Sequence, residues 1–310
     1  MTITKYLFSL AALAVLVGGF GSVASANHSW DGPYGTYHWA RTTPTFSFQL
    51  GDNVSSTWDS YLTTASSDWS ISDILDTQVV AGKGGKNCKA TLGRAEVCNS
   101  KYGRNGWLGI AQIWASGPHI VQGVVKMNDT YFNTATYNKP AWRAMVVCQE
   151  IGHIFGLDHQ DEEFANTNLG TCMDYTNDPA RDDLLGDNQH PNAHDYEELG
   201  NIYAHLDETT TIINQNTDPT TDGGNGRRNR NGQADVFVGE LGDDQTNWGR
   251  EIRRSADGRS SLFERDFGGG EKVITHVFWA EPRGPANLTA DILSNNPVLQ
   301  NLGLGNLFQF

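Results

Sequence analysis

The chain has 310 residues, of which 22 are basic and 36 are acidic, so its formal net charge at pH 7 is −14. A surface this negative repels polyanions, which excludes nucleic-acid binding and attachment to anionic membranes from the expected functions. The length predicts one or two domains with a buried core, at roughly 150 residues per domain.

The first 26 residues have the pattern of a secretory signal peptide. Lys5 is their only charged residue, an apolar run follows over residues 7–20, and Ala24 and Ala26 supply the small residues of a cleavage site. We therefore predict cleavage after Ala26 and a secreted, extracellular protein. No later segment is apolar enough to span a membrane.

The start of the mature chain predicts two strands and then a helix. Residues 37–40 and 46–50 form the predicted strands, and the second alternates with the period of a half-buried strand. Apolar residues then recur at helical spacing over residues 52–70, at Trp58, Tyr61, Leu62, Ala65 and Trp69. Asp52 or Asn53 is expected to cap this helix.

Residues 107–115 and 119–127 predict two further strands, with His119 as a surface residue of the second. Between the first helix and these strands, residues 81–106 are rich in glycine and contain Cys88 and Cys98. A local disulfide between these two cysteines is the natural expectation for an exported protein, although the four cysteines of the chain allow three pairings.

The most informative stretch is Cys148–His159, with the sequence CQEIGHIFGLDH. On a helix that starts near Pro140, Gln149 and His153 share one face because residues four apart lie one turn apart. Glu150 flanks that face. Gly156 can take a left-handed conformation that ends the helix, so that the chain folds back and His159 meets His153.

This stretch resembles the active-site motif of the metzincin zinc metalloproteases, in their matrixin-like branch. The resemblance implies that His153 and His159 are zinc ligands, that Glu150 is the general base, and that Gly156 is the turn glycine. Gln149 stands where the family has its first histidine ligand. A glutamine oxygen is a neutral and poorer zinc ligand than imidazole, which implies weaker zinc binding and a site with only two histidines.

A second match lies downstream of the motif, in Thr171–Tyr175. Met173 resembles the methionine that metzincins place beneath the metal, and Tyr175 resembles the tyrosine that some of them bring to the zinc. The resemblance favours a disulfide between Cys148 and Cys172, which would join the active-site helix to the methionine turn. The rival interpretation leaves one of these cysteines as a free thiol that replaces the missing histidine.

The resemblance covers residues 35–207 and implies an α+β fold. It consists of a twisted mixed sheet backed by helices, an active-site helix, a methionine turn and a final helix. Residues 107–115 would then be the edge strand to which an extended peptide substrate adds. Gln112 occupies the place of a histidine that binds a second, structural zinc in matrixins, so we expect no structural zinc there.

Acidic residues follow the motif at Asp161, Glu162 and Glu163. Asp161 is expected to orient a ligand histidine through a hydrogen bond. The cluster is also compatible with a Ca²⁺ ion, although a solvated loop is the simpler interpretation.

A last helix is expected after His190. Asn192 or His194 is expected to serve the start of this helix, and His190 is a spare donor for the metal.

The C-terminal part differs in composition. Residues 214–233 are polar and predict a flexible linker that contains Arg227 and Arg228 as a target for trypsin-like proteases. Residues 234–280 predict β structure, with a hairpin around the Asp257–Gly258 turn and another strand over 272–280. We expect a signal peptide (1–26), a metalloprotease domain (27–213), the linker and a β-rich region (234–310). That region is either an accessory unit or strands that return to the main domain.

Taken together, the sequence predicts a secreted zinc-dependent metalloendopeptidase with one catalytic Zn²⁺ and a protein or peptide substrate. Water activated by the zinc would attack the scissile carbonyl, Glu150 would move the proton to the leaving amine, and Tyr175 would help to stabilise the oxyanion. Two alternatives remain. One is a pseudoprotease that binds peptides without cutting them, and the other is a structural protein that acts through its C-terminal β region.

Overall fold

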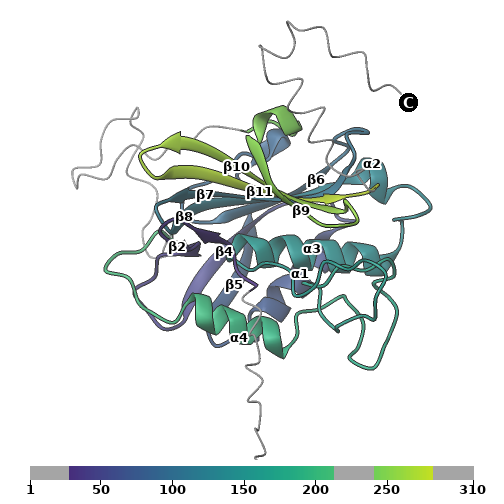
Figure 1. The fold of residues 1–310 in the computed structure, drawn as a ribbon, viewed down its shortest axis with the longest axis horizontal. Helices are drawn as coiled ribbons and strands as arrows, with labels where there is room; N and C mark the ends of the chain where they lie inside the picture. Colours follow the sequence, from purple (N-terminus) through teal and green to yellow (C-terminus); the bar gives the residue numbers. More distant parts are fainter. Residues whose placement is uncertain (1–27, 213–240, 282–310) are drawn as a thin grey trace, which may run out of the picture.

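The computed structural model describes residues 28–212 and 241–281 (Figure 1). The predicted signal peptide and the predicted linker lie outside the described residues. Within them the protein has mixed α and β structure, as the sequence predicts for the fold class. None of the described helices is long and apolar enough to cross a membrane. The finer, metzincin-like assignment stays a prediction.

One large sheet organises the molecule, and its strands follow the order β5-β4-β6-β8-β7-β11-β10-β9, with β3 paired to β8. Neighbours from β5 to β8 are parallel, and neighbours from β8 to β9 are antiparallel. The strands are β3 (His38–Trp39), β4 (Phe46–Asn53), β5 (Leu75–Ala81), β6 (Ala95–Ser100), β7 (Trp107–Ser116), β8 (His119–Asn128), β9 (Arg250–Arg254), β10 (Ser260–Gly268) and β11 (Glu271–Trp279). A separate two-stranded sheet joins β1 (Asp31–Gly32) and β2 (Gly35–Thr36).

Three helices lie on one side of the large sheet (Figure 1). They are α1 (Asp59–Trp69), α3 (Pro140–Ile154) and α4 (Ala193–Ile202), while the short α2 (Asp129–Phe132) follows β8. The short 3-10 turns are η1 (Gly85–Asn87) and η3 (Gln245–Asn247). Helix α3 packs against β7, β8 and α1 and is buried along almost its whole length, so residues of this helix reach the centre of the molecule.

The predicted strands 107–115 and 119–127, the helix that starts at Pro140 and the Asp257–Gly258 hairpin are confirmed by β7, β8, α3 and the β9–β10 pair. The prediction for the first helix is wrong at its start. Asp52 and Asn53 belong to β4, where they pair with Val97 and Cys98 of β6, and helix α1 begins only at Asp59. Pairing with two neighbouring strands outweighs the capping tendency of these two residues.

The C-terminal strands return to the main sheet, which is the second of the two alternatives for residues 234–280. Strand β11 pairs with β7 along its whole length, from Glu271 opposite Ser116 to Trp279 opposite Trp107. The prediction that residues 107–115 form an edge strand is therefore wrong, because β7 has β8 on one side and β11 on the other. Local sequence patterns do not reveal this partner, since more than 150 residues separate the two strands.

Both predicted disulfides are present. Cys88 is bonded to Cys98 and Cys148 to Cys172, with a Cα–Cα distance of 6.0 Å in each pair. The alternative of a free thiol beside the metal is therefore excluded for Cys148 and Cys172. These crosslinks fit an exported protein, because disulfides persist in oxidising compartments.

A buried ion pair holds the loop before β6 against the sheet. Glu96 is fully buried, and its carboxylate accepts hydrogen bonds from the Arg94 guanidinium, the Thr91 hydroxyl, the Asn53 amide and the backbone N–H of Lys83. Burial raises the pKa of Glu96, but these hydrogen bonds outweigh it and lower the pKa below its usual value. The ionised carboxylate therefore stabilises the fold.

We predict that Glu96→Gln lowers the free energy of unfolding by about 3 kcal/mol at neutral pH, because it leaves Arg94 buried without a charged partner. A carboxyl whose pKa is lowered by folding contributes stability above its unfolded pKa of about 4.3 and loses it as the pH falls through the folded value. The difference between the two proteins should therefore shrink in acid. Urea unfolding followed by tryptophan fluorescence measures this, with the exposed Glu197→Gln as control. An equal effect of both substitutions, or a difference that grows in acid, would contradict it.

Candidate metal centre

Helix α3 brings the motif residues to the inner side of the sheet. Gln149, Glu150 and His153 are all fully buried. Gly156 follows the helix with a φ of +94°, and a Cβ atom there would lie 2.1 Å from the carbonyl oxygen of Tyr37. Only glycine combines this conformation with this close approach, so Gly156 allows the turn that returns the chain toward His159.

The two motif histidines meet as the sequence predicts. Nδ1 of His153 donates to the carbonyl oxygen of Leu157 at 2.9 Å, and Nδ1 of His159 lies 3.3 Å from Oε1 of Glu162. These acceptors leave the Nε2 atoms as the lone-pair nitrogens, and the two Nε2 atoms face each other at 3.0 Å. Metal-binding histidines share this arrangement, in which the far ring nitrogen is held by a carbonyl or a carboxylate.

A third histidine completes the group, and the sequence analysis missed it. His276 lies on β11 opposite Ala111 of β7, and its ring centroid is 4.0 Å from that of His153 and 4.8 Å from that of His159. One ring nitrogen from each of the three residues lies within 4.8 Å of the others. The only feature of the sequence that points to His276 is its position as a single histidine within the apolar strand Val273–Trp279.

Glu150 lies between helix α3 and the sheet. Its Oε2 is 3.0 Å from Nδ1 of His276, and its Oε1 has no hydrogen-bond partner among the described residues. Gly109 of β7 makes room for this carboxyl group, since a Cβ atom at that position would lie 2.5 Å from Oε1. Glu150 therefore contacts the third histidine and keeps one oxygen unpaired.

Burial sets the protonation of this cluster. Desolvation raises the pKa of Glu150 well above its usual value. Desolvation, followed by the neighbouring histidines, lowers the pKa of His153 and of His276 well below theirs. The imidazoles of His153 and His276 are therefore neutral, which is the form that binds a metal.

The methionine turn lies beneath helix α3. Nε2 of Gln149 donates to the carbonyl oxygens of Cys172 at 2.8 Å and Asp174 at 3.4 Å. The Oε1 atom of Gln149 is buried without a hydrogen-bond partner in the described parts of the chain. The Cys148–Cys172 disulfide fixes this turn against the helix. Gln149 is thus anchored on its nitrogen side and has a free oxygen donor.

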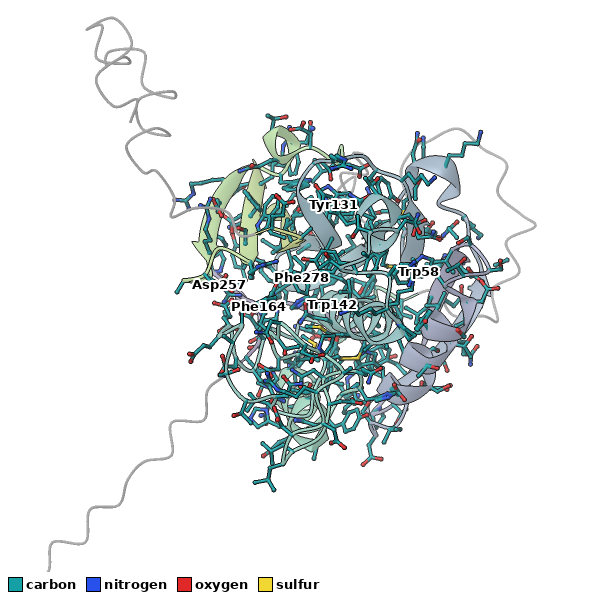
Figure 2. All side chains as sticks on the ribbon, turned by 90° about the vertical axis from the view of Figure 1, so that its right-hand side faces the viewer. Trp58, Tyr131, Trp142, Phe164, Asp257 and Phe278 are labelled. Atoms are coloured by element: carbon teal, nitrogen blue, oxygen red, sulfur yellow. A yellow bond between two sulfur atoms is a disulfide. The ribbon has the colours of Figure 1, made fainter. Side chains whose placement is uncertain are left out.

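Tyr175 joins the turn to the histidine group. Its hydroxyl lies 3.3 Å from Nε2 of His276, and its ring contacts that of His159 edge to face at 4.4 Å. Phe278 of β11 packs on Tyr175 and also on Trp142 of α3, beside which it lies in Figure 2. Strand β11 therefore contributes both a polar and an apolar residue to the region of the motif.

Two expectations about neighbouring residues are wrong. Glu162, rather than Asp161, contacts His159, because Asp161 accepts hydrogen bonds from Asn166 and from the backbone N–H of Glu163. His190 is not a spare metal donor, since it does not belong to the group of His153, His159 and His276 and contacts Asp68 at 2.7 Å instead. Asn192 does cap helix α4, as predicted for the start of that helix. A Ca²⁺ ion at the acidic loop stays a prediction.

The C-terminal strands cover the histidine group. Arg253 of β9 forms a paired contact with the carboxylate of Asp158, which lies just before His159. Glu150, His153, Tyr175 and His276 are all fully buried beneath this cover, and His159 is 7% exposed. The described conformation therefore gives a peptide no path to Glu150.

The residues present fit a zinc ion. In a tetrahedral zinc site with Zn–N distances of about 2.0–2.1 Å, two ligand nitrogens lie about 3.3 Å apart. The 3.0 Å between the Nε2 atoms of His153 and His159 is close to this value. The same distance suits a hydrogen bond between the two rings, and a cation takes the place of that proton when both rings carry their own proton on Nδ1.

No known family model matches the chain, and no curated protein has a significantly similar sequence.

We predict that Gly152→Ala destabilises the protein by about 1–3 kcal/mol through overpacking. A Cβ atom at Gly152 would lie 2.5 Å from Sδ of Met173 and 2.7 Å from the ring of Trp69. Gly200→Ala in α4 is the matched control, because nothing lies within 4 Å of its Cβ position. This control should be stabilising by about 0.5–1 kcal/mol. Thermal unfolding compares them, and equal effects would show that the methionine does not pack tightly under the helix.

Proposed function

We propose that this chain is a secreted zinc-dependent endopeptidase with its metal held by His153, His159 and His276. The observation that carries the proposal is the approach of the two Nε2 atoms to 3.0 Å, beside the third imidazole and Glu150. Three imidazoles are a common ligand set of catalytic zinc. In this proposal His276 supplies the third imidazole, which the motif lacks at Gln149.

A zinc ion bound there supplies Lewis-acid chemistry, which acidifies water and polarises a carbonyl group. Glu150 is the residue that takes a proton from the attacking water and gives it to the leaving amine. Burial raises the pKa of this carboxyl group, which strengthens it as a proton acceptor. The Tyr175 hydroxyl, 3.3 Å from His276, is placed to donate a hydrogen bond to a developing oxyanion.

Access to Glu150 requires a second conformation in this proposal. Strand β11 fills the position beside β7 to which an extended peptide would add, and Arg253 holds β9 to Asp158. Peptide hydrolysis therefore needs the C-terminal strands to move away from β7. The unpaired Oε1 of Gln149, one helical turn before His153 on α3, is a further neutral donor on the same face of the helix. The described conformation corresponds to a closed, inactive state.

Complete burial of the site favours a second candidate function, a pseudoprotease that does not cut peptides. Structural zinc sites are closed by protein ligands, whereas catalytic sites keep one position open. His153, His159 and His276 with the Tyr175 hydroxyl offer four donors without solvent. In this case the metal stabilises a secreted module that binds peptides or proteins.

We predict that Glu150→Gln lowers the rate of cleavage of an unfolded protein substrate by about 100-fold or more, because it removes the general base. Its zinc content, measured by mass spectrometry of the metal, should stay near that of the natural protein. Glu163→Gln, an exposed acid in the adjacent loop, is the matched control and should change neither quantity.

The same assay includes Arg253→Gln, which weakens the contact between β9 and Asp158. It should raise the rate of cleavage by opening the site, whereas Arg250→Gln on the exposed end of the same strand should not. Zinc-loaded protein that cleaves nothing, with or without Arg253→Gln, would contradict the peptidase and leave the pseudoprotease.

A further inference from the structure

A second group of histidines lies near the C-terminal end of α3 and the turn between β7 and β8. His38 on β3 pairs with His119 at the start of β8. The segment after α4 brings His205 and Asp207 to the same place. Asp207 is held there by two hydrogen bonds with the backbone of Arg41, at 2.8 and 2.9 Å. Three parts of the chain that are distant in sequence therefore meet at one carboxylate.

The three imidazoles surround a single oxygen atom. Oδ1 of Asp207 lies 3.5 Å from Nε2 of His38, 3.2 Å from Nε2 of His119 and 3.5 Å from Nε2 of His205. In a tetrahedral zinc site with ligands at about 2.0–2.2 Å, the ligand atoms lie about 3.3–3.6 Å from one another. The distances from Oδ1 to the nitrogens of His38 and His205 fit the edges of such a tetrahedron, and these three ligand atoms lie within 4.8 Å of one another. His119 approaches Asp207 but does not belong to this group.

Hydrogen bonding alone does not account for His38. Its Nδ1 donates to the carbonyl oxygen of Thr36 at 2.8 Å, so its Nε2 has a lone pair and no proton when the ring is neutral. The Nε2 atom is buried and makes no hydrogen bond of normal geometry, although it faces the Asp207 carboxylate.

A buried lone pair that faces a carboxylate oxygen without a proton between them is unfavourable. A divalent cation between the two atoms removes this repulsion and uses the imidazole of His205 as well. Imidazole and carboxylate ligands together suit zinc. His119, which the sequence predicts to be an ordinary surface residue, is half-buried and lies closest to Asp207.

We propose that His38, His205 and Asp207 form a second zinc site, separate from the one on α3. The three donors come from two distant parts of the chain, and His119 lies beside them, 3.2 Å from Asp207. The ion would fasten β3 to the segment that follows α4. This inference goes beyond the proposed peptidase and does not depend on any catalytic activity.

The test is the zinc stoichiometry of the purified mature protein and of two variants, with inorganic zinc as the only added metal. His205→Ala removes the most exposed ligand of the second site, and His276→Ala removes one ligand of the first. We expect two zinc ions per chain in the natural protein, one in each variant, and none bound tightly in the double variant. Chelation should also lower the melting temperature of His276→Ala, which retains only the second site.

His190→Ala is the matched control, since His190 is an exposed histidine paired with one carboxylate, that of Asp68, at 2.7 Å. It should retain both ions. If the natural protein binds one ion, and this ion is lost in His276→Ala but kept in His205→Ala, the second site is overturned and the proposed metal centre of the peptidase stands. If the single ion is instead lost in His205→Ala and kept in His276→Ala, the second site is supported and the first is contradicted. Protein without zinc would contradict both.

Discussion

The pairing of β11 with β7 is the interaction on which the rest of the structure depends. It places His276 beside Ala111, two residues along β7 from Gly109, which makes room for the carboxyl group of Glu150. Without this pairing the motif would offer only His153, His159 and an unpaired glutamate. Strand β11 also occupies the edge of β7 to which an extended peptide would add. The same backbone hydrogen bonds therefore bring in the third imidazole and keep a peptide away from Glu150.

Both histidine groups share a physical feature, which is a buried ring nitrogen that faces another possible metal ligand at a distance that suits a shared cation. In one group two Nε2 atoms face each other at 3.0 Å, and in the other Nε2 of His38 faces the carboxylate of Asp207 at 3.5 Å. Buried polar atoms are normally paired because an unpaired one costs free energy. The second ring nitrogens of His38 and His153 are held by backbone carbonyls, which fixes the rings in orientations that suit a cation.

Much of the fold follows from local sequence. The periodicity of residues 107–127 predicts two strands with nearly the observed ends, and Pro140 marks the start of α3. The spacing of Cys88 and Cys98 predicts their disulfide, whereas the pair Cys148–Cys172 is favoured by the resemblance to metzincins. The meeting of His153 and His159 followed from helix geometry and Gly156. These features depend on contacts within a few residues or on one covalent bond.

The missed features depend on contacts between distant parts of the chain. Nothing near Trp107–Ser116 indicates that β11 pairs with this strand, so the local sequence predicts an edge strand and does not connect His276 with the motif. The start of α1 was misplaced for a similar reason, since Asp52 and Asn53 look like helix caps until β6 pairs with them. Likewise, the approach of His38, His119 and His205 to Asp207 becomes visible only once the segment after α4 is placed.

The most direct test of the central claim is a crystal structure of the zinc-loaded mature protein, with anomalous scattering recorded at the zinc absorption edge. The account predicts an anomalous peak about 2.0–2.1 Å from a ring nitrogen of each of His153, His159 and His276. A peak bound by His153 and His159 with His276 turned away, or no peak beside His153, would contradict the claim that β11 completes the metal centre.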